Sequence, residues 1–200
     1  MYSKYDITTA KWGEVKEMGH YDMAILPWGA TEPHNLHLPY CTDMLTAQAV
    51  AFEVAEKAAM QGVNLMVLPG IPLGSQNPGQ IELPYCIHTS QTTQMAILRD
   101  VVRSLKRQGI RKLMIMSGHG GNNFKGIIRD IMIEDPEMII VHNEWFAIIP
   151  RTDYFEEKED DHAGELETSV MLHYYPDLVR MDLAGDGQFS KFGIEGLNTK

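Results

Sequence analysis

The feature that most constrains the fold of this chain is the alternation of short apolar segments with longer segments of helical periodicity. The short segments are rich in Leu, Ile, Val and Met and are bounded by Pro, Gly or polar residues, as buried strands are. Strands are expected over residues 23–26, 64–68, 112–116 and 138–141. Helices are expected over residues 43–61, 89–108 and 163–175, and from Asn122 or Asn123 to about Glu134. The alternation predicts βαβ units and therefore an α/β fold with a mostly parallel sheet.

The overall charge argues against two classes of partner. The 200 residues include 17 Lys and Arg against 27 Asp and Glu, and the formal net charge of −10 disfavours nucleic acid and anionic membrane surfaces. No apolar run approaches the ~18 residues that span a bilayer, and the first residues lack the apolar centre of a signal peptide. We therefore expect a soluble cytoplasmic protein. Cys41 and Cys86 have no CxxC spacing, so neither a disulfide framework nor a thiolate metal site is expected.

The polar motifs should gather at one edge of the sheet. No internal repeat, low-complexity tract or linker divides the chain, so one domain is expected. In open parallel sheets, ligands bind beyond the carboxyl ends of the strands. The connections that follow Leu26, Leu68 and Met116 should therefore converge on one crevice.

The first motif follows the first predicted strand and combines carboxylates with imidazoles. Glu32 and His34 are separated by one proline, so in an extended segment their side chains point the same way. His37 and Asp43 follow on the same loop. Oxygen and imidazole ligands of this kind suit Zn²⁺, Mn²⁺ or Fe²⁺. The alternative is structural: Glu32 pairs with a surface lysine, His37 bonds a carbonyl and Asp43 caps the next helix.

The second motif is Gly118-His119-Gly120-Gly121-Asn122, directly after the third predicted strand. The glycines allow close approach of the backbone to a ligand, and amides at the start of the next helix can hold an anion. A phosphate loop is the rival interpretation, but neither GxxxxGK[ST] nor GxGxxG is present. His119 at the carboxyl end of a strand is a candidate metal ligand.

The third motif, over residues 160–169, places His162 before Glu165 and Glu167 at the start of the last predicted helix. His162 is a candidate general base, but the spacing does not decide which glutamate accompanies it. The alternative is an acidic first turn that only stabilises its helix. The acidic run just upstream, over residues 153–161, is expected to be a solvated loop, with a cation-attracting rim as the other option.

Together these motifs resemble those of the creatininase (creatinine amidohydrolase) family. The matching segments are residues 26–39 with Thr42 and Asp43, then 69–74, 118–122 and 162–169, in the family's order. The resemblance covers about residues 20 to 182. It implies a three-layer α/β/α sandwich, a divalent metal centre that is often binuclear, and hydrolysis of amide, lactam or formamide C–N bonds. It also implies a homo-oligomer, often a hexamer.

The resemblance also assigns roles to individual residues. The positions that match the family's metal ligands are Glu32, His34, Asp43 and His119, with Asp43 in the place of the residue that bridges two ions. His162 matches the catalytic histidine. Glu167 matches an acid that is a ligand or lies close to one, and it is carried as both a catalytic and a metal-binding candidate. The cofactor is then one or two divalent ions, with Zn or Mn favoured and Fe as a further option.

Three departures from the family pattern bear on these roles. The usual Glu-Gln-His-Gly is Glu-Pro-His-Asn at residues 32–35, which keeps the ligands and changes the loop. Creatininase has an acidic ligand two residues after its histidine, where this chain has Gly121, so a second metal site requires Glu165 or Glu167. Family members also continue beyond the position of Lys200. We therefore expect one creatininase-like domain over residues 1–200, with the loss of the family's C-terminal segment left open.

The function expected from the sequence is metal-dependent hydrolysis of a C–N bond in a small cyclic or N-acyl substrate. The substrate is a small molecule, and a water activated by the metal is the nucleophile. One alternative is a metal-binding small-molecule module of the same fold without hydrolytic activity, which the glycine at position 121 motivates. Another is a scaffold subunit that gains catalysis only in an oligomer.

Overall fold

A four-stranded parallel sheet forms the centre of the molecule in the computed structural model, which describes residues 4–148, 150–156 and 162–187. The strands lie in the order β2-β1-β3-β4. Their bounds are β1 Met23–Trp28, β2 Leu65–Val67, β3 Lys112–Ser117 and β4 Ile139–Glu144. All three pairings are parallel, as the alternation of strands and helices predicts.

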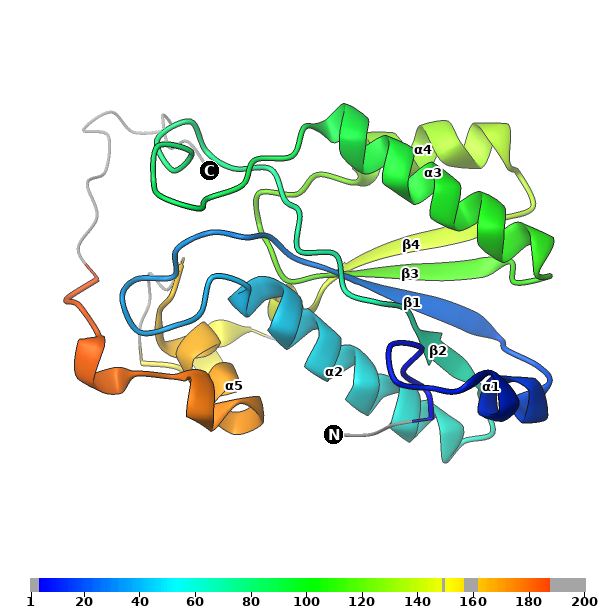
Figure 1. Cartoon of the computed structure of the whole chain (residues 1–200), viewed down its shortest axis with the longest axis horizontal. Coiled ribbons are helices and arrows are strands. Elements are labelled where there is room, and N and C mark those ends of the chain that lie inside the picture. The colour runs from blue at the N-terminus through cyan, green and yellow to red at the C-terminus, as the bar shows by residue number, and fades with distance from the viewer. Residues whose placement is uncertain (1–3, 149, 157–161, 188–200) are drawn as a thin grey trace.

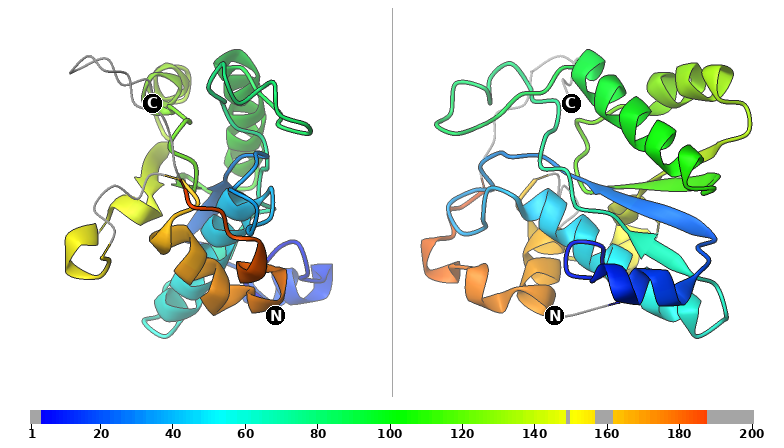
Figure 2. Two further views of the ribbon diagram at one scale, coloured as in Figure 1. Left: turned by 90° about the vertical axis from the view of Figure 1, so that its left-hand side faces the viewer. Right: turned by 45° about the vertical axis from the view of Figure 1, so that its right-hand side comes forward.

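Helices cover both faces of this sheet, which makes three layers (Figure 1). The helices are α1 Trp12–Met18, α2 Thr42–Ala59, α3 Gln91–Arg107, α4 Lys125–Glu134 and α5 Glu165–Tyr174. Four single 3₁₀ turns are Trp145–Ala147, Arg151–Asp153, Pro176–Leu178 and Met181–Leu183. Figure 2 shows α3 and α4 on one side of the sheet and α2 with α5 on the other. The expected three-layer α/β/α sandwich is confirmed.

Side-chain alternation along β1 divides the core into two layers. Leu26 and Trp28 pack with residues of α3 and α4, whereas Ile25 packs against the alanine face of α2. A smaller third cluster of Leu38, Ala163 and Met171 holds α5 against the rest of the molecule. Because strands buried on both faces need apolar side chains on both sides, the apolar runs read from the sequence belong to central strands.

The predicted strands and helices are all present among the described residues, with differences at their ends. Strands β1, β3 and β4 end later than expected, because main-chain pairing continues to Trp28, Ser117 and Glu144. Helix α1 was not expected. It has no buried residue and so leaves no apolar stripe in the sequence.

The start of α4 differs from the prediction that Asn122 or Asn123 caps it. Phe124 occupies the N-cap position, and its aromatic side chain makes no cap hydrogen bond. Asn123 Oδ1 accepts a hydrogen bond from Lys125 N at 3.3 Å, but Asn122 Oδ1 accepts from Ser75 N, on the connection after β2, at 3.1 Å. The helix therefore begins later than its polar residues suggest.

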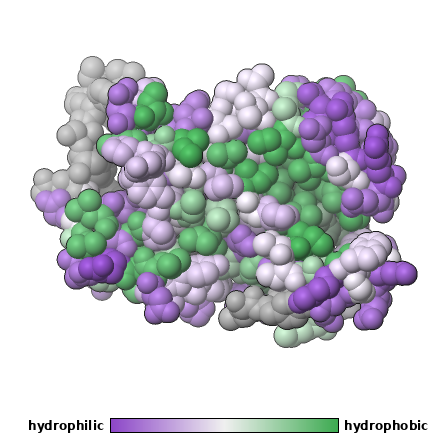
Figure 3. All heavy atoms as spheres, in the orientation of Figure 1, coloured by the Kyte–Doolittle hydropathy of each residue, from purple (hydrophilic) through white to green (hydrophobic). Residues whose placement is uncertain are grey.

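One apolar surface remains between α1, α3 and the β2 side of the sheet. A groove of about 1250 Å³ lies there, and Figure 3 shows apolar side chains over this region. Of the described helices, none combines the length and the apolar character that a membrane span requires. The two cysteines are free, as expected.

Candidate metal centre

The connections after the first three strands meet at the carboxyl edge of the sheet, on the left-hand side of Figure 1. His119 Nδ1, after β3, lies 2.9 Å from Glu32 Oε1, after β1. On the other side of its ring, His119 Nε2 donates to Ser75 O, after β2, at 2.7 Å. The prediction that these loops converge on one place is confirmed.

The first group of side chains consists of Glu32, Asp43 and His119, and each is at most 8% exposed. His119 Nδ1 lies 3.1 Å from Asp43 Oδ2 as well as 2.9 Å from the Glu32 carboxylate. Asp43 Oδ2 is buried and has no hydrogen bond of acceptable geometry from the described residues. A buried carboxylate oxygen without a donor is costly in a folded protein, and a cation would compensate it.

The second group consists of His34, Asp43 and Glu167, so it shares Asp43 with the first. His34 Nε2 lies 2.8 Å from Asp43 Oδ1 and 4.0 Å from Glu167 Oε2. In each group one potential ligand atom per residue lies within 4.8 Å of the others. The two oxygens of Asp43 thus face different imidazoles, which is the arrangement a carboxylate adopts when it bridges two ions.

In both His34 and His119, the ring nitrogen that faces away from Asp43 donates a hydrogen bond to a main-chain carbonyl. His34 Nδ1 donates to Glu32 O at 3.0 Å, and His119 Nε2 donates to Ser75 O at 2.7 Å. Because a carbonyl only accepts, the opposite nitrogen of each neutral ring is free of hydrogen and can bind a cation. Metal-ligating histidines in proteins are generally oriented in this way. The residues present therefore fit a divalent ion.

The pKa values indicate a strongly cation-attracting site. Burial alone would lower the pKa of His34, but Asp43 and the other carboxylates raise it to about 9. Burial also opposes the charged form of His119, yet Asp43 and Glu32 raise its pKa to about 10. Burial would raise the pKa of Asp43, but His34 and His119 hold it well below its usual range. The carboxylates therefore favour positive charge on both imidazoles.

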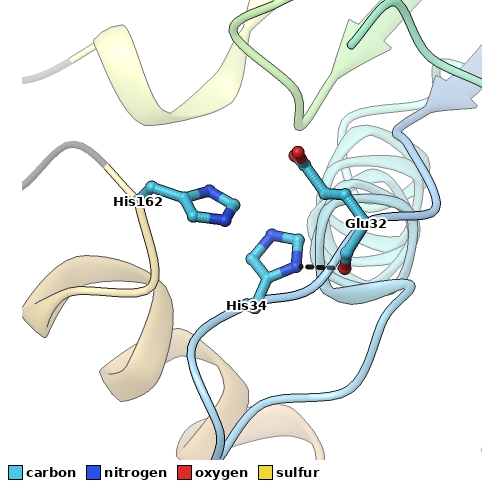
Figure 4. A group of neighbouring side chains, drawn as sticks. All are labelled: Glu32, His34 and His162. Carbon is cyan, nitrogen blue, oxygen red and sulfur yellow. Dashed lines mark hydrogen bonds between the residues drawn. The ribbon is translucent and has the colours of Figure 1, made fainter. Parts of the chain in front are cut away.

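His162 stands beside His34, with ring centroids 4.4 Å apart, and its Nε2 donates to Pro33 O at 2.8 Å. Figure 4 shows His162 approaching from the segment before α5, with Glu32 and His34 on the β1 connection. Ala163 has a φ of 55°, which prevents the predicted helix from including it, so the helix begins at Glu165. One ring nitrogen of His162 lies close enough to Glu32 and His34 to join a third potential ligand group.

The structure separates the two glutamates that the sequence left undecided. Glu167 Oε2 accepts a hydrogen bond from Ala163 N at 2.6 Å and lies beside His34. Burial raises the pKa of Glu167. Glu165 Oε2 accepts from Glu156 N instead, at 2.8 Å, and Glu165 belongs to none of the potential ligand groups of the described residues. The carboxylate brought to the cluster is therefore that of Glu167.

Two of the three glycines of the second motif, Gly118 and Gly121, are explained by close approach. A Cβ at Gly118 would lie 2.1 Å from Asp43 O, and one at Gly121 would lie 2.4 Å from Ser75 O and 2.5 Å from His119 Nε2. A side chain at position 121 would therefore displace the His119 ring. The packing around His119 therefore leaves no room for an acidic side chain at position 121, and the second carboxylate near His34, after that of Asp43, comes from Glu167.

The structural roles considered as alternatives for Asp43, Glu32 and His37 differ from what the structure shows. Asp43 lies in the first turn of α2, but its carboxylate faces imidazoles rather than helix amides, and the N-cap is Cys41. Glu32 pairs with His119 and accepts from Gln80 Nε2 at 3.0 Å rather than from a lysine. His37 Nε2 lies 2.8 Å from Thr168 Oγ1 and so ties the β1 connection to α5. Part of the acidic run, residues 157–161, and the segment 188–200 lie outside the described residues.

Sequence analysis missed a buried polar network behind His119. Gln94, on α3, is fully buried and donates through Nε2 to Asn122 Oδ1 at 3.0 Å and to Ser75 Oγ at 3.1 Å. Asn122 belongs to the second motif, but a single Gln on a helix gives no signal that it joins a buried hydrogen-bond network. Ser75 and Asn122 also line a pocket of about 540 Å³.

The fold and the site define a class: an α/β protein with a histidine–carboxylate cluster, suited to a divalent ion, at the carboxyl edge of its sheet. The family model described as creatinine amidohydrolase matches residues 8–199. The chain therefore belongs to the creatininase family.

Two curated relatives illustrate the range of this family. The chain is 30% identical over 181 residues to a creatinine amidohydrolase of Pseudomonas putida, covering 81% of this chain and 68% of that one. It is 30% identical over 162 residues to a mycofactocin precursor peptide peptidase of Mycolicibacterium smegmatis, covering 80% and 61% respectively. Other relatives are named as deformylases. These names all describe hydrolases of C–N bonds.

Solved structures agree with the fold. A Bacteroides fragilis protein described as a candidate creatinine amidohydrolase is 55% identical, with a TM-score of 0.94, over 97% of this chain and 77% of that one. A creatininase variant described as a Zn–Zn form is 26% identical, with a TM-score of 0.77, over 98% and 84%. A further creatininase structure, described as a manganese form, is 24% identical and supports the fold alone.

Proposed function

We propose that this protein is a metal-dependent amidohydrolase that cleaves a C–N bond of an amide, lactam or formamide in a small cyclic or N-acyl substrate. The proposal rests on the membership of the creatininase family and on the histidine–carboxylate cluster. The single observation that carries it is the position of Asp43. Its two oxygens lie 2.8 Å from His34 and 3.1 Å from His119, so one carboxylate serves two ligand groups.

In this proposal two divalent ions are held by overlapping sets of residues. Glu32, Asp43 and His119 hold one, and His34, Asp43 and Glu167 hold the other. A bound divalent ion supplies Lewis acidity, which lowers the pKa of water towards ~7 and polarises a carbonyl. Imidazole with carboxylate oxygen favours zinc or manganese, with iron as a further option. The creatininase variant described as a Zn–Zn form supports zinc.

The protein's own groups provide proton transfer. Cleavage of a C–N bond requires a proton at the leaving nitrogen, and His162 is the exposed imidazole nearest to the cluster. Its Nε2–H now donates to Pro33 O at 2.8 Å, which holds the ring above His34. We assign His162 the role of proton donor. Glu167 orients the same turn because it accepts from Ala163 N.

The glycine at position 121 no longer argues for a binding module without hydrolysis. That alternative arose because the family's second acidic ligand is missing. In this proposal Glu167, whose Oε2 lies 4.0 Å from His34 Nε2, would supply a carboxylate to the second ion in place of residue 121. Hydrolysis is the function this arrangement supports best.

The test combines metal content with turnover. The purified protein is stripped with a chelator, reloaded with Zn²⁺ or Mn²⁺, and incubated with creatinine, 2-pyrrolidone, hydantoin and N-formyl amino acids while amine, carboxylate and formate are measured. We expect turnover of at least one compound by the loaded protein and none by the stripped protein. Exchange of His162 for Asn should abolish turnover and leave metal content unchanged.

Two results would contradict the proposal in different ways. A protein that binds no divalent ion would remove the metal centre. A loaded protein that binds compounds of this panel tightly without cleaving any would favour the binding module instead.

A further inference from the structure

The orientation of His119 depends on one main-chain carbonyl. His119 Nε2 donates to Ser75 O at 2.7 Å, and this bond leaves Nδ1 directed at Glu32 and Asp43. If Ser75 O moved away, the neutral ring could carry its hydrogen on Nδ1, where it would block the cation. The position of Ser75 therefore decides which tautomer the metal encounters.

Ser75 lies in the long connection between β2 and α3, so the strand ladder does not fix it. Its main-chain N–H donates to Asn122 Oδ1 at 3.1 Å, and its hydroxyl donates to Thr89 O at 3.1 Å. Asn122 Nδ2 in turn donates to Gly29 O at 3.2 Å. The Asn122 side chain thus joins the connections that follow β1, β2 and β3.

Gln94, on α3, bonds to both Asn122 and Ser75. Its Nε2 lies 3.0 Å from Asn122 Oδ1 and 3.1 Å from Ser75 Oγ. Gln94 is 0% exposed and Asn122 is 4% exposed, so bulk water has no access to replace either amide. Buried polar networks of this kind fix a single arrangement because each lost bond leaves a partner unsatisfied.

We infer that Asn122 and Gln94 are positioning residues that hold the Ser75 carbonyl against His119 Nε2 and so keep Nδ1 available for the cation. The inference rests on the proposed metal centre. It adds two residues that bind neither ion nor substrate and that act through Ser75. Neither residue lies in the ligand groups described above.

Zinc affinity is the first measurement. Competition of the folded protein with a chromophoric chelator gives the zinc dissociation constant of the wild type, Asn122→Ala, Gln94→Met and the double variant. Partners that orient metal-ligating histidines typically change metal affinity by about 10- to 100-fold. We expect a loss in that range for Asn122→Ala, a smaller loss for Gln94→Met, and a non-additive double variant because the two residues share one network.

The matched control is Gln91→Met. Gln91 is the first residue of α3, one turn before Gln94, and it is exposed. The same exchange there should leave zinc affinity within about twofold of the wild type, as surface substitutions generally have small effects.

The second measurement separates positioning from general stability. Long-range ¹H–¹⁵N NMR of the zinc-loaded protein distinguishes a ring protonated at Nε2 from one protonated at Nδ1. We expect the His119 ring to be protonated at Nε2 alone in the wild type. In both single variants we expect a mixture of rings protonated at Nε2 and rings protonated at Nδ1. A lower melting temperature with wild-type zinc affinity and an unchanged tautomer would overturn the inference.

The remaining outcomes are also decisive. Where Asn122→Ala does not fold, Gln94→Met supports the same conclusion alone, because Met keeps the length of Gln and removes only the donor and acceptor. A wild-type protein that binds no zinc would overturn the proposed function together with this inference. Zinc binding that neither variant changes would overturn the inference alone.

Discussion

The two halves of the candidate metal centre share Asp43 but are built by different parts of the fold. The Glu32–His119 half lies on connections that leave β1 and β3 directly, and both side chains are almost fully buried. The His34–Glu167 half depends on α5, which is held against α2 and the β1 connection by the small cluster around Leu38 and Met171. The first half is therefore positioned by the sheet, and the second by the docking of one helix.

This difference implies that the Glu32–His119 half is more rigid than the His34–Glu167 half. His119 is already within 3.1 Å of both carboxylates of its half, whereas His34 and Glu167 are 4.0 Å apart. The Glu167 side chain is also 16% exposed, against 0% for His34. We expect the sheet-bound half to bind its ion more tightly than the half that includes α5.

The largest expected effect comes from removing the residue that both halves share. In Asp43→Asn, one carboxylate oxygen becomes an amide that cannot bind a cation, so both ions should be lost. We expect affinity for each to fall by more than about 100-fold, beyond the range for indirect partners. Metal content after gel filtration, measured by mass spectrometry, checks this.

Asp6→Asn is the control, since Asp6 is also buried, at 3% exposed, but its carboxylate accepts from Thr8 N and Thr9 Oγ1 and belongs to none of the ligand groups of the described residues. Undiminished metal content in Asp43→Asn would mean that the two halves do not share a ligand.

The next largest effect should be confined to one half. Glu167→Gln should release the ion beside His34 and retain the one beside His119, so the metal content falls from two ions per chain to one. Glu165→Gln is a matched control on the same helical turn, because that side chain bonds Glu156 N and not the cluster. Equal effects of the two exchanges would show that α5 does not contribute the second carboxylate.

A smaller effect is expected when one methyl group is added beside Nε2 of His119. Gly121→Ala places a Cβ 2.5 Å from His119 Nε2, which should destabilise the protein by about 1–3 kcal/mol and weaken zinc binding in the sheet-bound half. Gly120→Ala has open space around its Cβ and is the control. Urea unfolding and zinc titration measure both effects, and indistinguishable variants would argue against the tight packing of His119.

The last expected effect concerns stability rather than metal binding: the stability of the metal-free protein should change with pH. The pKa values of His34 and His119 are raised from 6.5 to about 9 and about 10. Between pH 6.5 and 10 the folded state therefore binds more protons than the unfolded state, so the free energy of unfolding falls as the pH rises. Stability from these groups is complete below pH 6.5 and is lost through pH 9 to 10.

The zinc-loaded protein should lack this decline, because its imidazoles are already neutral. Melting temperatures at intervals from pH 6 to 10 compare the two forms. A metal-free protein whose melting temperature rises over this window would contradict the assigned pairing of the histidines with Asp43.

The sequence predicted the sheet-bound half better than the half on α5. Glu32 and His119 follow buried strands closely, and the rule that strand ends converge brings them together. The choice between Glu165 and Glu167 could not be made, because it depends on the positive φ of Ala163, which delays the start of the helix. A non-glycine residue in that conformation has no sequence signature.

The supporting residues were the least predictable part. Gln94 is a single polar residue within an amphipathic helix, and only its depth in the fold distinguishes it from an exposed Gln. Gln80 reaches Glu32 from a long connection whose path no periodicity indicates. Local patterns indicated the candidate ligands because strands and glycines mark them, whereas the surrounding hydrogen bonds arise from tertiary packing.

Anomalous diffraction at the zinc absorption edge from crystals of the zinc-loaded protein tests the central claim most directly. The account predicts two peaks on opposite sides of the Asp43 carboxylate, separated by roughly 3.5–4 Å as in other two-metal sites. One peak should lie beside His119 and the other beside His34. No peak within bonding distance of Asp43, or zinc bound only elsewhere on the protein, would contradict it.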